Sequence, residues 1–214
     1  IGILEGALRD DLDAHAPRRM AVLDPLKLVL TNLADGHEES LAFANHPKDA
    51  SQGERAIPFS RTLWIEREDF AEVPPPGFKR LTVGGDVRLR GAGIVRCDEV
   101  VKDADGRVVE LRCTLDPESR PGMEGANRKV KGTIHWVSAT RGVPAEIRLY
   151  DRLFTVPNPD TDEDGKSYRD YLNPASRQVV TGYVEPAAAD AAPEQGFQFE
   201  RNGYFVADRY DHAP

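Results

Sequence analysis

Short alternating segments, separated by glycine and proline turns, run through most of this chain. The longest pair, 94–102 and 107–115, flanks the sequence D-A-D-G at 103–106, which is a strong β-hairpin signal. Many short strands at regular spacing indicate a β-sandwich or β-barrel. The other predicted strands are 27–33, 62–70, 86–90, 129–137, 145–150, 178–184 and 197–206.

Helix is expected mainly at the start of the chain. Leu4, Leu8 and Leu12 recur every four residues, with acidic residues on the other side, and predict a helix over 3–19. The prolines Pro17 and Pro25 interrupt it with a short extended run. Shorter helical pieces are predicted at 167–172 and 186–191.

Composition excludes several classes of protein. The 214 residues are 40% hydrophobic and 30% charged, as in a globular domain. No apolar run approaches the roughly 20 residues of a membrane helix, and the N-terminus does not resemble a signal peptide. Without an initial Met, the chain is expected to be a piece of something longer. A net charge of −8 argues against a non-specific nucleic-acid coat and leaves a local nucleic-acid site open.

The two cysteines, Cys97 and Cys113, are too few for a disulfide framework or a cysteine-rich zinc site. They flank the D-A-D-G turn. If this turn is a three-residue loop, they face each other across the hairpin, and both a bridge and free thiols are open.

Motifs of metal binding and catalysis are weak. The sequence D-T-D-E-D-G at 160–165 begins like a calcium loop, but Tyr171 stands where the bidentate Glu belongs, so an exposed acidic loop is expected. No G-x-S-x-G or phosphate-binding loop is present. His135 is expected to be structural, and His46 to form hydrogen bonds in a loop.

Arginines gather in the stretch 78–93, F-K-R-L-T-V-G-G-D-V-R-L-R-G-A-G. In a strand, Arg88 and Arg90 lie on one face while Val87 and Leu89 lie on the other. Guanidinium groups can bind base edges or phosphates, or they can pair with surface acids. The acids of the preceding segment 61–73 make the second interpretation equally open.

Other basic and amide residues lie in distant segments. Arg18 and Arg19 follow the predicted helix, Gln198 and Arg201 lie in F-Q-F-E-R, and Lys129–Gly132 reads K-V-K-G. Together they suggest a basic, hydrogen-bonding strip assembled from separate parts of the chain.

Several strings resemble glutaminyl-tRNA synthetases of the bacterial type over nearly the whole chain. In order they are A-P-R-R-M-A-V-L-D-P-L-K, N-H-P, I-E-R-E-D-F, F-K-R-L-T-V-G-G-D-V-R-L-R, C-D-E-V-V-K-D-A-D-G, R-K-V-K-G-T-I-H-W-V-S-A, E-I-R-L-Y-D-R-L-F-T-V-P-N-P and F-Q-F-E-R-N-G-Y-F. The resemblance implies the C-terminal anticodon-binding region, built mainly of two interleaved antiparallel β-barrels like a ribosomal-protein barrel, with a short N-terminal helical segment.

The resemblance also implies a division of the chain. Residues 1–17 would end a helical linker subdomain, 18–77 would form the first part of a proximal barrel, 78–152 a distal barrel, and 153–214 the second part of the proximal barrel. The family continues into a final strand that this sequence does not reach.

Anticodon contacts are implied where the motifs match. Arg18 and Gln198 resemble residues that recognise the central uridine. Arg80 resembles the residue that recognises the third base, a guanine, and Lys79 resembles a phosphate contact near the first base. The other implied contacts are Arg88 and Arg90, around the first base, and Arg201. A Gln of some members falls at Gly77, so that contact is expected to be missing or replaced.

The resemblance implies tRNA for glutamine and an upstream catalytic domain as partners, a monomer in the cytoplasm, no membrane, and free thiols. No cofactor or metal is expected in this chain, because the family's H-I-G-H and K-M-S-K-S-like signatures are absent; ATP with Mg²⁺ would bind the parent's catalytic domain. A glutamyl-tRNA synthetase and a protein-interaction barrel without base recognition remain alternatives.

Overall fold

The computed structural model describes residues 2–160 and 165–212. Its helices are α1 (Gly2–His15) and the short α2 (Pro186–Ala189), and the mainly β fold predicted from the sequence is confirmed. Helix α1 ends earlier than predicted, because the residue before Pro17 is disfavoured in the helical conformation. Among the described residues, no helix is long and apolar enough to cross a membrane.

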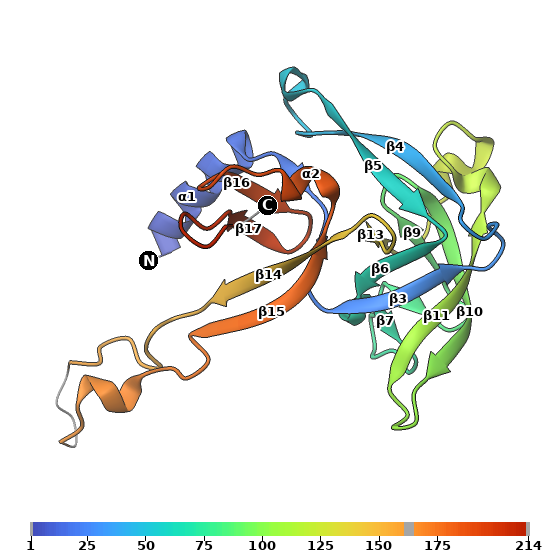
Figure 1. The fold of residues 1–214 in the computed structure, drawn as a ribbon. Helices are drawn as coiled ribbons and strands as arrows, with labels where there is room; N and C mark the ends of the chain where they lie inside the picture. The colour runs from blue at the N-terminus through green and yellow to red at the C-terminus, as the bar shows by residue number, and fades with distance from the viewer. Residues whose placement is uncertain (1, 161–164, 213–214) are drawn as a thin grey trace.

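The largest sheet has seven strands in the order β12-β9-β10-β11-β3-β6-β13. Strands β12 and β13 lie at opposite edges, yet only His135 and Trp136 separate them in the chain. The chain thus joins one edge of the sheet to the other, as expected for a barrel (Figure 1). The strands are β3 (Pro25–Leu30), β6 (Thr62–Glu66), β9 (Asp86–Leu89), β10 (Gly93–Lys102), β11 (Val108–Asp116), β12 (Thr133–Ile134) and β13 (Val137–Ser138).

The main hydrophobic core lies within this sheet. The Trp136 side chain is fully buried, and its ring meets the Phe59 ring edge-on with centroids 5.1 Å apart. Cys97 lies opposite Cys113 in the β10–β11 ladder, as the hairpin spacing predicts, and both are buried thiols. The large apolar side chains are thus gathered in the barrel, which provides a rigid support for surface groups.

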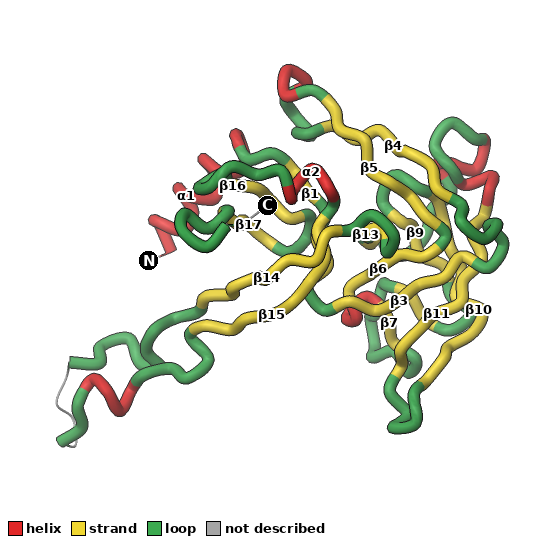
Figure 2. The backbone as a smooth tube through the Cα atoms, in the orientation of Figure 1, coloured by secondary structure: helices red, strands yellow, loops and turns green. Residues whose placement is uncertain are grey.

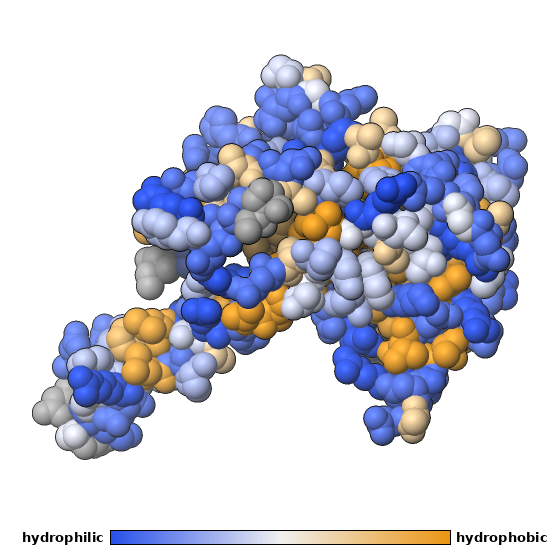
Figure 3. All heavy atoms as spheres, in the orientation of Figure 1, coloured by the Kyte–Doolittle hydropathy of each residue, from blue (hydrophilic) through white to orange (hydrophobic). Residues whose placement is uncertain are grey.

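Two smaller three-stranded sheets lie beside the barrel (Figure 2). One has the order β1-β16-β17 and the other β14-β15-β2. Strands β14 and β15 project from the body as an arm (Figure 1), and the space-filling view shows an apolar patch near its end (Figure 3). The strands are β1 (Arg18–Arg19), β2 (Ala21–Val22), β14 (Val143–Tyr150), β15 (Arg177–Val184), β16 (Gly196–Phe199) and β17 (Gly203–Val206). The remaining pairs are β4 (Glu38–Ala44) with β5 (Glu54–Ser60) and β7 (Phe70–Ala71) with β8 (Leu81–Thr82).

Two predicted strands are wrong in detail. The predicted strand 129–137 is mostly a crossing loop that contains β12 and the first residue of β13, because Trp136 turns inward and its Nε1 donates to the Arg90 carbonyl at 2.9 Å. The predicted strand 197–206 is a hairpin of β16 and β17. Its turn contains Arg201 with a φ of 69°, a left-handed conformation that a continuous strand cannot hold.

The division at residues 77 and 152 stays a prediction. The seven-stranded sheet contains β3 and β6 from the first segment together with β9, β10 and β11 from the second, so backbone hydrogen bonds cross the first boundary. The acidic loop at 160–165 lies largely outside the described residues. The turn predicted at 167–172 is a 3-10 helix at Tyr168–Tyr171.

Candidate nucleic-acid interface

Two arginines from distant segments meet at a buried carboxylate. Asp69 ends a 3-10 turn after β6 and is fully buried. The Arg201 guanidinium binds it through both terminal nitrogens, at 2.6 and 2.5 Å, and Arg80 Nε lies 2.9 Å from the same carboxylate. We call Arg80, Arg201 and Asp69 the arginine cluster.

The arginine cluster is buried at its base and open at its surface. The Arg80 side chain is 39% exposed and the Arg201 side chain 24% exposed. The hydrogen bonds that Arg201 donates to the Asp69 carboxylate raise the pKa of Arg201, although burial opposes the shift. Because Asp69 occupies only part of the five-donor guanidinium of Arg80, other N–H groups of that fork remain available at the surface.

A second buried carboxylate, Glu66, is connected to the arginine cluster through His135, whose Nδ1 lies 3.3 Å from Arg201 Nη1. Glu66 accepts backbone N–H bonds from Leu23 at 2.8 Å and Asp24 at 3.0 Å, and a side-chain bond from Asn202 at 3.0 Å. His135 is buried, with Nε2 lying 3.4 Å from Glu66, in keeping with the structural role expected for it. Burial raises the pKa of Glu66, but these hydrogen bonds, led by that of His135, outweigh it and hold the pKa below its ordinary value.

The turn after β16 connects the predicted site residues. Gln198 in β16 lies opposite Arg18 in β1, in a parallel pairing. The next two residues beyond β16 reach the barrel: Glu200 lies 3.0 Å from Arg90, and Arg201 enters the arginine cluster. The turn therefore brings together segments that are far apart in the chain: those of Arg18, Asp69, Arg80 and Arg90.

Arg18 is the most enclosed of the predicted residues. Its side chain is 7% exposed, Nη2 lies 2.6 Å from an Asp13 carboxylate oxygen, and Nη1 donates to the Ala16 carbonyl at 2.8 Å. A base edge would have to take the place of the Asp13 carboxylate to reach this guanidinium.

Arg88 and Arg90 share a strand face but lie in different surroundings. Val87 and Leu89 are fully buried, so the predicted alternation is confirmed. Arg88 donates to the backbone carbonyls of Arg128 at 2.7 Å and Ser119 at 3.4 Å, away from the Glu200 partner of Arg90. The ion-pair interpretation holds for Arg90, whereas Arg88 is fixed by carbonyl groups.

Sequence reasoning missed the acids that hold these cations. Asp69, Glu66 and Glu200 were not among the predicted site residues, although Glu66 and Asp69 belong to the acidic segment before the arginine-rich stretch. Their role depends on burial and on contacts between distant segments, and spacing along the chain encodes neither. His46 is buried and bonded to the Asp13 carbonyl and the Lys48 backbone, as predicted for a loop histidine.

The sequence of this chain matches a known protein family over most of its length. The family model described as tRNA synthetases class I (E and Q), anti-codon binding domain, matches residues 16–116, and a second model of the same description matches residues 133–208. The chain belongs to this family. The two matches include all seven predicted site residues.

The similarity to individual members extends over the whole chain. A glutamine–tRNA ligase of Xanthomonas euvesicatoria is 74% identical over 99% of this chain, and one of Xylella fastidiosa is 68% identical over 98%. The chain spans 36% of the length of each of these relatives. The similarity is thus to one part of a longer protein.

Proposed function

We propose that this chain binds the anticodon loop of tRNA for glutamine, as the anticodon-binding part of a glutamine–tRNA ligase. The observation that carries the proposal is the turn after β16, where Gln198 and Arg201 come together with Arg18 and Arg80. Both relatives compared above are glutamine–tRNA ligases, which favours the glutamine enzyme over the glutamate enzyme.

The chemistry of the site suits single-stranded RNA. Sequence-specific RNA recognition favours unstacked bases that are hydrogen-bonded on their edges. Guanidinium groups anchored by buried acids present donors in fixed directions, so little conformational entropy is lost when a base binds. An acidic remainder of the molecule would weaken binding to RNA in general.

The individual roles follow the family pattern. Arg18 and Gln198 recognise the central uridine, and Arg80 recognises the third base. Lys79 contacts a phosphate near the first base. Arg88 and Arg90 surround that first base, and Arg201 both supports the arginine cluster and reaches the loop.

The activity of the whole protein is a separate part of the proposal, because the relatives are longer than this chain. We propose that a catalytic domain elsewhere in the whole protein binds ATP with Mg²⁺ and charges the tRNA in the cytoplasm as a monomer.

The test is a titration of the chain with a short RNA hairpin carrying the anticodon loop, and with hairpins changed at each anticodon base. Arg80→Ala should reduce discrimination at the third base by about 5- to 150-fold, the equivalent of about 1–3 kcal/mol, and leave discrimination at the other two bases intact. Arg107→Ala, at the exposed tip of the β10–β11 hairpin, is the matched control. Absence of binding at low salt would instead favour a protein-interaction barrel.

A further inference from the structure

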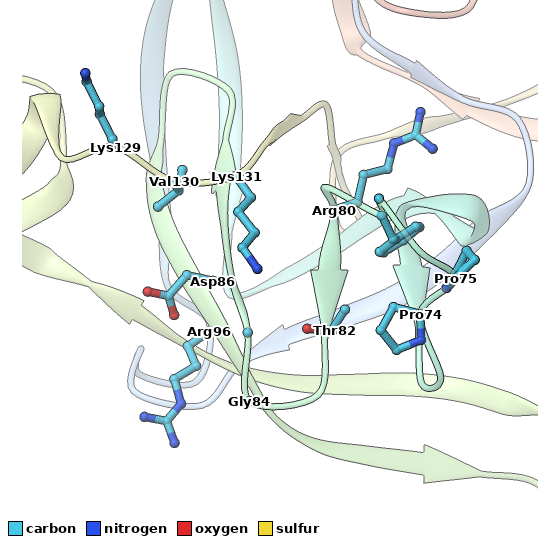
Figure 4. A pocket seen from close by; sticks show the side chains of 13 residues that line it. Pro74, Pro75, Arg80, Thr82, Gly84, Asp86, Arg96, Lys129, Val130 and Lys131 are labelled. Carbon is cyan, nitrogen blue, oxygen red and sulfur yellow. The ribbon is translucent and has the colours of Figure 1, made fainter.

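An open cavity of about 580 Å³ lies beside the arginine cluster. Figure 4 shows its lining side chains, which come from the loop before β8, from β8, β9 and β10, and from the loop that leads to β12. We call this cavity the lysine groove. The residues that matter to its chemistry are Pro74, Phe78, Arg80, Asp86, Lys129 and Lys131.

The two lysines of the groove have no ion-pair partner among the described residues, although the lining also contains the acid Asp86. Arg80 is paired with Asp69, and the other arginine of the lining, Arg96, lies 3.2 Å from Asp98. Neither Lys129 nor Lys131 has an ionic or hydrogen-bonded partner among the described residues. The acid of the lining, Asp86, lies 3.8 Å from Arg128, which has a closer partner in Asp116 at 2.8 Å, so Asp86 offsets part of the lysine charge. A net positive charge remains available to a ligand.

Lys131 is held at a fixed place relative to Arg80. The next residue, Gly132, passes so close to the backbone of Lys79 that a Cβ atom there would overlap the Lys79 carbonyl oxygen. The Gly132 carbonyl also accepts the backbone N–H of Arg88 at 3.0 Å. In Figure 4 the Lys131 side chain points into the lysine groove between Asp86 and Thr82, while Lys129 points outward from its rim. Only a glycine allows this crossing.

We infer that the lysine groove binds a backbone phosphate of the single-stranded RNA, next to the nucleotide whose base Arg80 recognises. This inference rests on the proposed function and adds Lys131 as the phosphate ligand, with Lys129 raising the local potential. A flexible, strongly hydrated ammonium suits a phosphate, which needs charge but no fixed fork. The apolar wall of Pro74 and Phe78 offers a surface for the attached sugar or base.

The experiment measures binding of the anticodon hairpin to the chain and to Lys131→Ala over a series of salt concentrations. Loss of one phosphate contact to a single strand should make the slope of log K against log salt shallower by about 0.7, and weaken binding about two- to fivefold at low salt. The loss should be the same for cognate hairpins and for hairpins changed in the anticodon. Arg107→Ala removes an equal charge elsewhere and should leave the slope unchanged.

A second measurement locates the phosphate. Each loop phosphate is replaced in turn by a neutral methylphosphonate. One replacement should weaken binding to the unchanged chain but have no further effect on Lys131→Ala. If the hairpin binds and Arg80→Ala loses discrimination, but the slope of Lys131→Ala equals that of the unchanged chain, the groove is not a phosphate site. If Arg80→Ala keeps full discrimination, the proposed function fails separately. Unfolding curves of both variants confirm that they fold.

Discussion

The arginine cluster and the lysine groove lie side by side but hold their cations in opposite ways. Arg80 and Arg201 are fixed by the buried Asp69, whereas Lys129 and Lys131 have no ionic partner among the described residues. Both regions are positively charged at the surface of an acidic chain.

Under the proposed function, the difference suits two tasks in RNA binding. Base recognition needs donors in fixed directions, which a buried acid provides at the cost of neutralising part of the charge. Phosphate binding needs charge more than direction, so a mobile ammonium without a protein partner is suitable. Asp69 and Glu200 hold Arg80 and Arg90 of the arginine-rich stretch in place, and the proposal gives the arginines and the lysines separate roles.

The largest expected effect follows from removing the shared acid of the arginine cluster. Asp69→Asn leaves two guanidiniums without their carboxylate. We expect the free energy of unfolding to fall by about 2–3 kcal/mol, less than the 3–5 kcal/mol of a fully buried pair, because both arginines reach solvent. Urea denaturation measures the change.

The matched control is Glu68→Gln, which removes the neighbouring acid. The Glu68 side chain is 72% exposed and lies 3.6 Å from Arg80. Its loss should change stability by less than about 1 kcal/mol. Equal losses for the two variants would mean that burial of Asp69 does not distinguish the cluster from an ordinary surface ion pair.

The next effect concerns exchange of the two kinds of cation. Arg80→Lys keeps the charge but loses the planar fork, so discrimination at the third anticodon base should fall by about 1–3 kcal/mol. Lys131→Arg should leave both affinity and discrimination nearly unchanged, because a phosphate accepts either cation. Hairpin titrations at one salt concentration measure both. Tolerance of Arg80→Lys would show that the arginine cluster provides only charge.

The local features of the fold could be predicted from the sequence. The D-A-D-G turn correctly places Cys97 opposite Cys113, and period-two alternation correctly assigns Val87 and Leu89 to the core. Both depend on neighbours in the chain. The burial of Asp69 could not be predicted, because it results from the meeting of a turn after β6, the entry to β8 and the β16–β17 turn.

The segment 129–137 is a second case in which contacts between distant parts of the chain could not be predicted from the sequence. The alternating pattern of 129–137 predicts a single strand, but pairing with both edges of the sheet breaks that strand in two. The position of Lys131, just before β12, depends likewise on the close approach of Gly132 to the backbone of Lys79. Nonlocal contacts decide the position of this lysine, and no pattern along the chain reports them.

The smallest expected effect is a change in acid sensitivity when the buried Glu66 is replaced. The pKa of Glu66 lies below its ordinary value of 4.5 in the folded chain. A group whose pKa is lowered on folding stabilises the folded state above the unfolded pKa, and this contribution is lost as pH falls through the folded value. Unfolding free energies measured between neutral pH and pH 3 should therefore fall less steeply on the acid side in Glu66→Gln than in the unchanged chain.

The control for this prediction is Glu118→Gln, at an exposed glutamate in the 3-10 turn that follows β11. It should keep the acid slope of the unchanged chain. The comparison concerns slopes rather than absolute stability, since Glu66→Gln also weakens the bonds to Leu23 and Asp24. If the slope is the same in all three proteins, Glu66 does not couple protonation to folding.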